Sequence, residues 1–178
     1  MIRKKHSKKE TFAFIDSQNL NLGVKSQGWK LDFNKFIVFL KQKYRVKKAF
    51  LFLGFIPKNS KLYASLEEMD YILVFKPVLQ ANSYSKKAKV KGNVDAELVL
   101  HTMIQYENYK KAIVVSGDGD FFCLVEYLAK QNKLLHVFTP NKYYSRLFKP
   151  YSGFIVRIDQ LRGSLEQKKT GISGRSKP

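Results

Sequence analysis

The feature that most constrains the fold is a regular alternation of short apolar segments with longer amphipathic segments. The apolar segments are nearly continuous in hydrophobicity, as in strands that are buried on both faces of a parallel sheet. We predict strands at residues 12–16, 48–54, 71–75, 112–116, 134–138 and 154–158. Helices are predicted at residues 33–44, 60–69, 94–106 and 121–131. The pattern indicates an α/β fold in which helices cover both faces of a mostly parallel sheet.

The chain has the length of a single domain. With 178 residues, 44% of them hydrophobic, it has enough apolar surface to form one core. We place the domain at residues 11–161, between basic tails at residues 1–10 and 162–178 that each carry five Lys or Arg and one Glu. Glycines and serines near the C-terminus predict that the second tail is disordered.

Basic residues exceed acidic residues in the tails and in the domain alike. The chain has 33 Lys and Arg against 14 Asp and Glu, a formal net charge of +19 at pH 7. Such an excess is typical of proteins that bind a polyanion, either nucleic acid or an anionic membrane surface. The membrane surface is the weaker interpretation, because neither tail has an amphipathic apolar face.

The sequence shows no sign of secretion or membrane insertion. Cys123 is the only cysteine, which excludes an internal disulfide and a cysteine-rich zinc site. No apolar run reaches the roughly 20 residues that span a bilayer, and no apolar segment follows the basic N-terminus. We therefore expect a cytoplasmic protein without a membrane partner.

Three aspartates directly follow apolar strands. Asp16 ends the first predicted strand, and Asp118 and Asp120 follow the fourth in the segment Ser-Gly-Asp-Gly-Asp. A carboxylate at the end of a buried strand is costly unless a partner compensates its charge. Open parallel sheets bind ligands outside the carboxyl ends of their strands, where the strand order reverses. If the first and fourth strands are neighbours there, the three carboxylates converge.

A fourth carboxylate reaches the same edge from a helix. Asp95 opens the helix predicted at residues 94–106 and shares a face with the apolar residues that follow it at helical spacing. Clustered carboxylates repel one another and are normally held by a divalent cation, with Mg²⁺ or Mn²⁺ favoured by all-oxygen ligands. We predict a site for one or two such ions. In the alternative, Asp118 or Asp120 caps the following helix and Asp95 occupies a favourable first turn.

Three further residues near this site are weaker candidates. His101 lies one turn beyond Glu97, at a position that can face the site, although a histidine on the helix surface is the plainer interpretation. Cys123 has no histidine partner nearby and is expected to be a small core residue.

A polar, basic segment interrupts the alternation at residues 80–93. Two interpretations fit it: a solvated connector, or a loop that contacts nucleic-acid phosphates. In the second, its lysines hold the nucleic-acid backbone while tyrosines stack on unpaired bases. The candidate residues for these contacts are Tyr84, Lys86, Lys87, Lys89, Lys91, Tyr143 and Tyr144.

At these motifs the chain resembles the NYN domain family, the LabA-like branch of the PIN-like nuclease superfamily. The similar segments follow the family's order at residues 14–20 (FIDSQNL), 91–95 (KGNVD) and 116–121 (SGDGDF). The resemblance implies a three-layer, Rossmann-like α/β/α sandwich. It also implies an acidic site of Asp16, Asp95, Asp118 and Asp120, with Asn19 and Ser116 as polar neighbours.

The resemblance further implies a metal-dependent endoribonuclease acting on RNA that is single-stranded or contains loops. Many relatives carry another aspartate where this chain has His101, so either Glu97 or His101 substitutes, or metal occupancy is altered, or activity is lost. One alternative is a non-catalytic RNA-binding module of the same fold. Another metal-dependent phosphotransfer enzyme is a second alternative, weakened because Toprim domains carry glutamate in the motif where this chain has Asp16.

Overall fold

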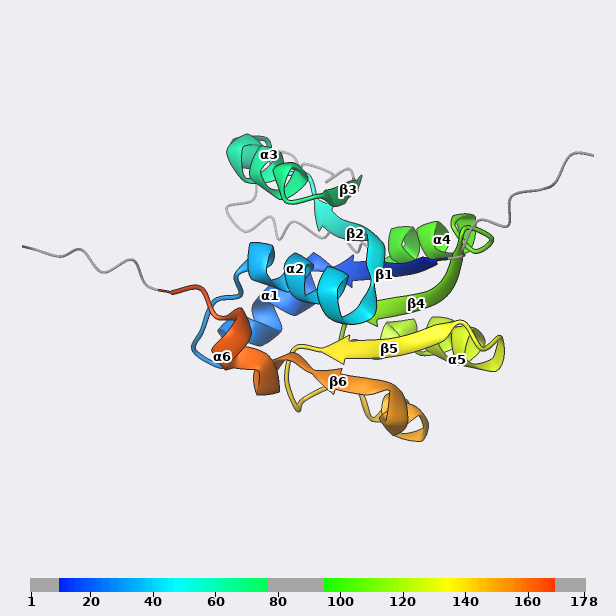
Figure 1. Cartoon of the computed structure of the whole chain (residues 1–178). Helices are drawn as coiled ribbons and strands as arrows, with labels where there is room; N and C mark the ends of the chain where they lie inside the picture. The colour runs from blue at the N-terminus through cyan, green and yellow to red at the C-terminus, as the bar shows by residue number, and fades with distance from the viewer. Residues whose placement is uncertain (1–9, 77–94, 169–178) are drawn as a thin grey trace, which may run out of the picture.

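The computed structural model describes residues 10–76 and 95–168, which form a six-stranded sheet covered by helices (Figure 1). All strand pairs are parallel, in the order β3-β2-β1-β4-β5-β6. The strands are β1 (Glu10–Asp16), β2 (Val46–Gly54), β3 (Tyr71–Lys76), β4 (Tyr109–Val115), β5 (Leu134–Thr139) and β6 (Ile155–Arg157). Each overlaps a predicted strand. This strand order is that of Rossmann-type sheets, so the predicted fold class is confirmed.

Helices lie on both faces of the sheet (Figure 1). One face is covered by α1 (Ser17–Lys25), α2 (Phe33–Tyr44), α3 (Ser60–Glu68) and α6 (Arg162–Leu165). The other face is covered by α4 (Asp95–Ile104), α5 (Phe122–Lys130) and a 3₁₀ segment at Arg146–Phe154. The result is a three-layer α/β/α sandwich with an apolar core on each side of the sheet.

The side chains of β1 explain why both layers form. Ala13 and Ile15 join the core under α1 and α2, whereas Phe12 and Phe14 join the core under α4 and α5. All four residues are at most 3% exposed. Because β1 is buried on both faces, its sequence is a continuous apolar run instead of an alternating one.

The end of β1 lies where the strand order reverses. From β1 the chain moves outward to β2 and β3, and then returns through α4 to β4 on the other side of β1. The register pairs Ile15 with Val115, so β1 and β4 end side by side. The predicted adjacency of these two strands is therefore confirmed.

The helix α1 is not among the predicted elements. It begins directly after β1, with Asp16 as its N-cap, and its buried residues are Leu20 and Val24. These two positions are four residues apart and so lie on one helix face. The polar residues at the start of α1 hide the pattern, because only two apolar side chains turn towards the sheet.

The C-terminal boundary also differs from the prediction. Residues 162–168 belong to the tail predicted as disordered, but α6 and an antiparallel bridge between Leu31 and Glu166 hold them against the domain. Leu165 is 1% exposed, and its carbonyl oxygen accepts a hydrogen bond from the Asp32 amide at 2.9 Å. One buried leucine and these backbone bonds extend the domain past the position where composition suggested its end.

The prediction for Cys123 is wrong, since this residue is exposed. The buried residues of α5 are Leu124, Val125 and Leu128, so Cys123 lies outside the face that packs on the sheet. The remaining tail residues, 1–9 and 169–178, lie outside the part of the chain that the structure describes. Across residues 10–76 and 95–168, no helix has the length and apolar character needed to cross a membrane.

Candidate functional site

Asp16 is the centre of the candidate site. It ends β1, caps α1 and is only 4% exposed. Its Oδ1 accepts a hydrogen bond from the Asn19 amide at 3.0 Å, and its Oδ2 accepts one from the Ser116 hydroxyl at 3.2 Å. Burial raises the pKa of Asp16; the two hydrogen bonds oppose this effect, and the negative charges of Asp95 and Asp118 add to it. The two charges that act on this carboxyl group in this way, those of Asp95 and Asp118, are both negative.

Ser116 connects Asp16 to the loop after β4. It is fully buried, and its hydroxyl oxygen also accepts a hydrogen bond from the Asp118 amide at 3.1 Å. Asn19 adds a second connection, because its Oδ1 accepts a hydrogen bond from the Gly117 amide at 2.9 Å. Asn19 and Ser116 are therefore polar neighbours of Asp16, as the family resemblance implied.

Asp118 and Asp120 are exposed in the loop after β4. Asp118 caps the short 3₁₀ helix Gly119–Phe121, and its Oδ1 accepts a hydrogen bond from the Asp120 amide at 3.1 Å. The capping role that the sequence left open is thus present. Capping does not remove Asp118 from the site, because its charge still acts on Asp16. Within the described residues, the Asp120 side chain has no comparable link to Asp16.

Asp95 is the first residue of α4 and is half-buried. The helix packs against β1 and against the 3₁₀ helix after β4. Leu98 and Thr102 are buried, so the face predicted from their spacing is the one that turns inward. The charge of Asp95 raises the pKa of Asp16. Three separate elements thus bring the carboxylates of Asp16, Asp95 and Asp118 within electrostatic range.

The donor atoms of this cluster suit a hard divalent cation. Carboxylate and hydroxyl oxygens are ligands that Mg²⁺ and Mn²⁺ prefer, and a cation would offset the repulsion that raises the pKa of Asp16. As they stand, the described residues include no group of three or more His, Cys, Asp or Glu side chains placed to hold a metal ion. The arrangement is therefore an electrostatically coupled acid cluster and not a closed coordination shell.

Glu97 and His101 have partners of their own. Lys76 Nζ lies 3.5 Å from Glu97 Oε2, which makes an ion pair. The His101 ring packs against the Phe52 ring with the centroids 5.7 Å apart. His101 is half-buried, so the expectation of a surface histidine is wrong: α4 lies over the sheet at this point. Because Phe52 is the register neighbour of Asp16, His101 lies at the flank of the acid cluster.

The predicted nucleic-acid contacts fall into two groups. The residues of the basic segment, Tyr84, Lys86, Lys87, Lys89 and Lys91, lie outside the described residues. Tyr143 and Tyr144 follow β5, which pairs with β4. Tyr143 is 74% exposed, whereas Tyr144 is half-buried and packs on the core under α4 and α5. Of these two tyrosines, Tyr143 is therefore the one that presents its ring to solvent.

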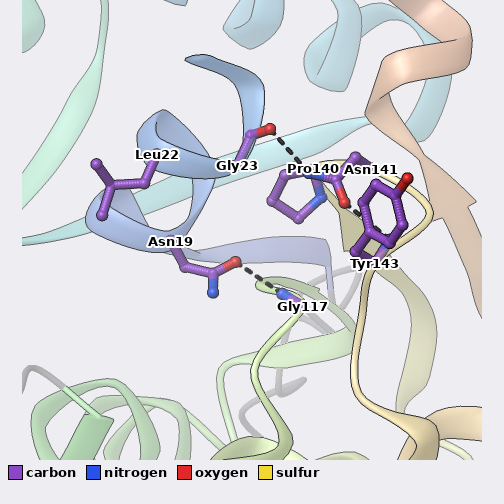
Figure 2. Close-up of a pocket in the computed structure, with 7 residues that line it drawn as sticks. All are labelled: Asn19, Leu22, Gly23, Gly117, Pro140, Asn141 and Tyr143. Carbon is purple, nitrogen blue, oxygen red and sulfur yellow. Dashed lines mark hydrogen bonds between the residues drawn. The ribbon is translucent and has the colours of Figure 1, made fainter. Parts of the chain in front are cut away.

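A pocket of about 160 Å³ lies beside the acid cluster, and the residues that line it follow β1, β4 and β5 in the sequence. Its lining residues are Asn19, Leu22, Gly23, Gly117, Pro140, Asn141 and Tyr143. Figure 2 shows these residues. Neither Pro140 nor Asn141 is among the site residues predicted from the sequence. The available signal was their position directly after β5, at the same edge of the sheet as the aspartates.

Comparisons with known proteins agree with this fold. The family model described as NYN domain matches residues 11–156. Low amplitude and bright protein LabA of Synechococcus elongatus is 20% identical, with 86% of each chain covered. A crystal structure of a protein of unknown function from Vibrio parahaemolyticus matches with a TM-score of 0.70 and 24% identity, over 93% of this chain and 100% of that chain. At this identity, the second similarity shows the fold alone.

The family match extends from β1 into β6 and includes all four aspartates of the predicted site. It spans the strand ends and the loops that position Asp16 and Asp118, and it covers well over half of the chain. The protein therefore belongs to the NYN domain family.

Proposed function

We propose that this protein is a metal-dependent endoribonuclease that cleaves RNA phosphodiester bonds at the aspartate cluster. The observation that carries the proposal is the buried carboxylate of Asp16 at the reversal of strand order, within electrostatic range of Asp95 and Asp118. Burying a carboxylate beside other carboxylates lowers the free energy of unfolding. Such an arrangement therefore indicates a functional role for the cluster. Membership of the NYN domain family supports the same activity, because the proteins of this family are generally nucleases.

Asp16, Asp95, Asp118 and Asp120 are the residues that would hold one or two Mg²⁺ or Mn²⁺ ions. The first three are already coupled electrostatically, and Asp118 and Asp120 are exposed, on the side from which a phosphate would approach. When bound, such ions lower the pKa of a coordinated water and stabilise the negative charge that develops on the scissile phosphate.

The other residues of the site keep the carboxylates in place. Both oxygens of Asp16 accept hydrogen bonds, from Asn19 and Ser116, which limits rotation of the carboxyl group. Ser116 also holds the backbone of Asp118, and Asn19 holds the backbone of Gly117. Positions fixed in this way before the substrate binds lower the cost of reorganisation during the reaction.

The formal net charge of +19 supports a polyanionic substrate, and the family supports RNA. Exposed Tyr143 favours single-stranded or looped RNA, whose unpaired bases are free to stack on an aromatic ring. We include the lysines of the basic segment, Lys86, Lys87, Lys89 and Lys91, as expected contacts to the RNA backbone.

A non-catalytic RNA-binding module of the same fold is the second candidate. Two observations favour it: Asp118 already serves as a helix cap, and the described residues hold no preformed group of metal ligands. In this case the carboxylates would be structural, and the basic surface would bind RNA without cutting it.

The decisive experiment follows cleavage of end-labelled single-stranded and hairpin RNA by the purified protein with Mn²⁺, Mg²⁺ or EDTA. The test variant is Asp118→Asn, because asparagine keeps an oxygen for the cap while removing the charge. The matched control is Asp70→Asn, an equal charge change at an exposed residue that pairs with Lys41. Its φ of 68° is tolerated by asparagine.

We expect metal-dependent cleavage by the wild type and Asp70→Asn, with loss of cleavage in Asp118→Asn. RNA binding without cleavage under every metal condition would instead identify the non-catalytic module. Cleavage that persists equally in Asp118→Asn would show that the acid cluster does not carry the reaction.

A further inference from the structure

We propose that the pocket between the ends of β1, β4 and β5 binds one unpaired nucleobase of the RNA strand. The inference rests on the proposed function, because it assigns a place to the nucleotide next to the phosphate at the acid cluster. It goes further by identifying the part of the substrate that the pocket recognises and the residues that recognise it.

The pocket and the acid cluster share a residue. The backbone amide of Asn19 donates a hydrogen bond to Asp16 Oδ1. The Asn19 side chain lines the pocket, and its Oδ1 accepts a hydrogen bond from the Gly117 backbone amide (Figure 2). Gly117 in turn lies between Ser116 and Asp118, the two residues that connect β4 to the cluster. A strand with its phosphate at Asp16 therefore has a neighbouring base at the mouth of this pocket.

The size and the apolar walls of the pocket fit a single base. Its volume of about 160 Å³ is below the roughly 300–1,000 Å³ of pockets for drug-sized ligands. Leu22 and Pro140 supply apolar walls, and Tyr143 supplies an exposed aromatic ring. Base–aromatic stacking tolerates any base, because every base has a π face. Lys142 Nζ lies 5.1 Å from the Tyr143 ring centroid. Its positive charge is therefore near the position of the RNA phosphate next to a base stacked on Tyr143.

The pocket also has a polar edge. The backbone amide of Gly117 can only donate, so the atom of the Asn19 side chain that faces it must be the oxygen. This hydrogen bond fixes the orientation of the Asn19 side-chain amide group. The remaining Nδ2 group of Asn19 has no hydrogen-bond partner among the described residues. It is a donor that a carbonyl oxygen or ring nitrogen of a base can accept from.

Hydrogen bonds and close packing hold the backbone around the pocket. Asn141 Nδ2 donates to the Gly23 carbonyl oxygen at 2.8 Å, and the Tyr143 amide donates to Asn141 Oδ1 at 2.8 Å. Gly23 lies so close to Pro140 that an added Cβ atom would be 2.5 Å from Pro140 Cβ. A site that is already ordered loses little conformational entropy on binding.

The test measures binding separately from cleavage. Fluorescence anisotropy follows a short labelled oligouridine in EDTA, with every protein carrying Asp118→Asn so that the strand stays intact. Leu22→Trp fills the pocket, and Tyr143→Ala removes the ring. The matched controls are Leu62→Trp on α3 and Tyr127→Ala on α5, both at exposed positions away from the pocket.

Loss of one stacked base predicts a Kd about 5- to 160-fold weaker for both pocket variants, while the controls stay within about twofold of the parent. A second set of probes has the same RNA sequence with one abasic nucleotide, placed at a different position in each oligonucleotide. At one position the missing base weakens binding by the parent protein but not by Tyr143→Ala.

Pocket variants that bind like their controls overturn this proposal, whether or not the wild type cuts RNA. If they weaken binding as expected but the wild type cuts no RNA with any metal, the nuclease proposal fails and the base pocket stands. Should Leu22→Trp fold poorly, Tyr143→Ala decides alone, because its side chain is 74% exposed and its loss leaves the fold intact.

Discussion

The hydroxyl of Ser116 donates to Asp16 Oδ2 across 3.2 Å, and so joins the ends of two strands that lie 100 residues apart in sequence. The same hydroxyl accepts a hydrogen bond from the Asp118 amide. Ser116 is fully buried and Asp16 nearly so, which means that water cannot replace this contact. One small side chain thus sets the position of both the buried and the exposed carboxylate.

Ser116→Ala is expected to destabilise the protein and to reduce cleavage. The substitution leaves a carboxylate oxygen and a backbone amide unpaired, at a cost of about 1–3 kcal/mol in the free energy of unfolding. Urea unfolding at neutral pH measures this cost as a lower midpoint. Ser152→Ala, at an exposed serine, is the control. Equal midpoints for the two variants would contradict the structural role of Ser116.

Mn²⁺ or Mg²⁺ is expected to raise the melting temperature, and EDTA to reverse the rise. At a cation concentration of 100 times Kd, the stabilisation is about 2.7 kcal/mol, or roughly 5–10 °C for a domain of this size. The rise should weaken towards acid pH, because burial raises the pKa of Asp16 and protons then compete with the ion.

Asp16→Asn and Asp118→Asn should each reduce this thermal shift, while Asp70→Asn keeps it, since Asp70 lies on the surface beside Lys41. Differential scanning fluorimetry over a range of metal concentrations makes the comparison. The same shift in all variants, or none in the wild type, would argue against a metal at the aspartate cluster.

His136 is expected to make stability fall as the pH drops below 6.5. Burial lowers the pKa of this imidazole, the Phe154 carbonyl opposes that effect, and the charge of Lys43 adds to it. The unfolded chain therefore binds a proton at a higher pH than the folded chain. The contribution of His136 to stability is fully present above pH 6.5 and is lost as the pH falls from 6.5 through the pKa of the folded state.

His136→Gln should flatten this part of the pH–stability curve, even though it also removes the ring packed 5.0 Å from the Tyr44 ring. The measurement is urea unfolding at a series of pH values, together with an NMR titration of the imidazole. A folded-state pKa above 6.5 in that titration would reverse the expected slope.

Gly23→Ala is expected to lower the melting temperature. The new methyl group would approach Pro140 Cβ to 2.5 Å, so α1 and the loop after β5 must separate, which typically costs about 1–3 kcal/mol. Gly163→Ala is the matched control, because an added Cβ there meets nothing within 4 Å. If the two variants have the same melting temperature, α1 does not pack tightly against Pro140 in solution.

Much of the fold follows from local patterns. The bounds of α2 agree with the prediction because the spacing of its apolar residues and the cap at Asp32 are both visible in nearby sequence. The six strands could also be predicted from local sequence, because each contains a short apolar run. By contrast, α1 has only Leu20 and Val24 as buried residues, and α6 depends on Leu165 reaching a core formed by distant segments, so local sequence predicted neither.

The sequence by itself determined the layered α/β architecture, the family, and the positions of the four candidate aspartates. The architecture follows from the periodicity of apolar residues, the family from the resemblance of three short motifs, and the aspartates from their places at two strand ends and at the start of one helix; all of these depend only on neighbouring residues. Tertiary structure alone decided that Ser116 bonds to Asp16 and that Asn19, Pro140 and Asn141 line one pocket. Such contacts depend on strand order and register, which bring together side chains that no local pattern connects.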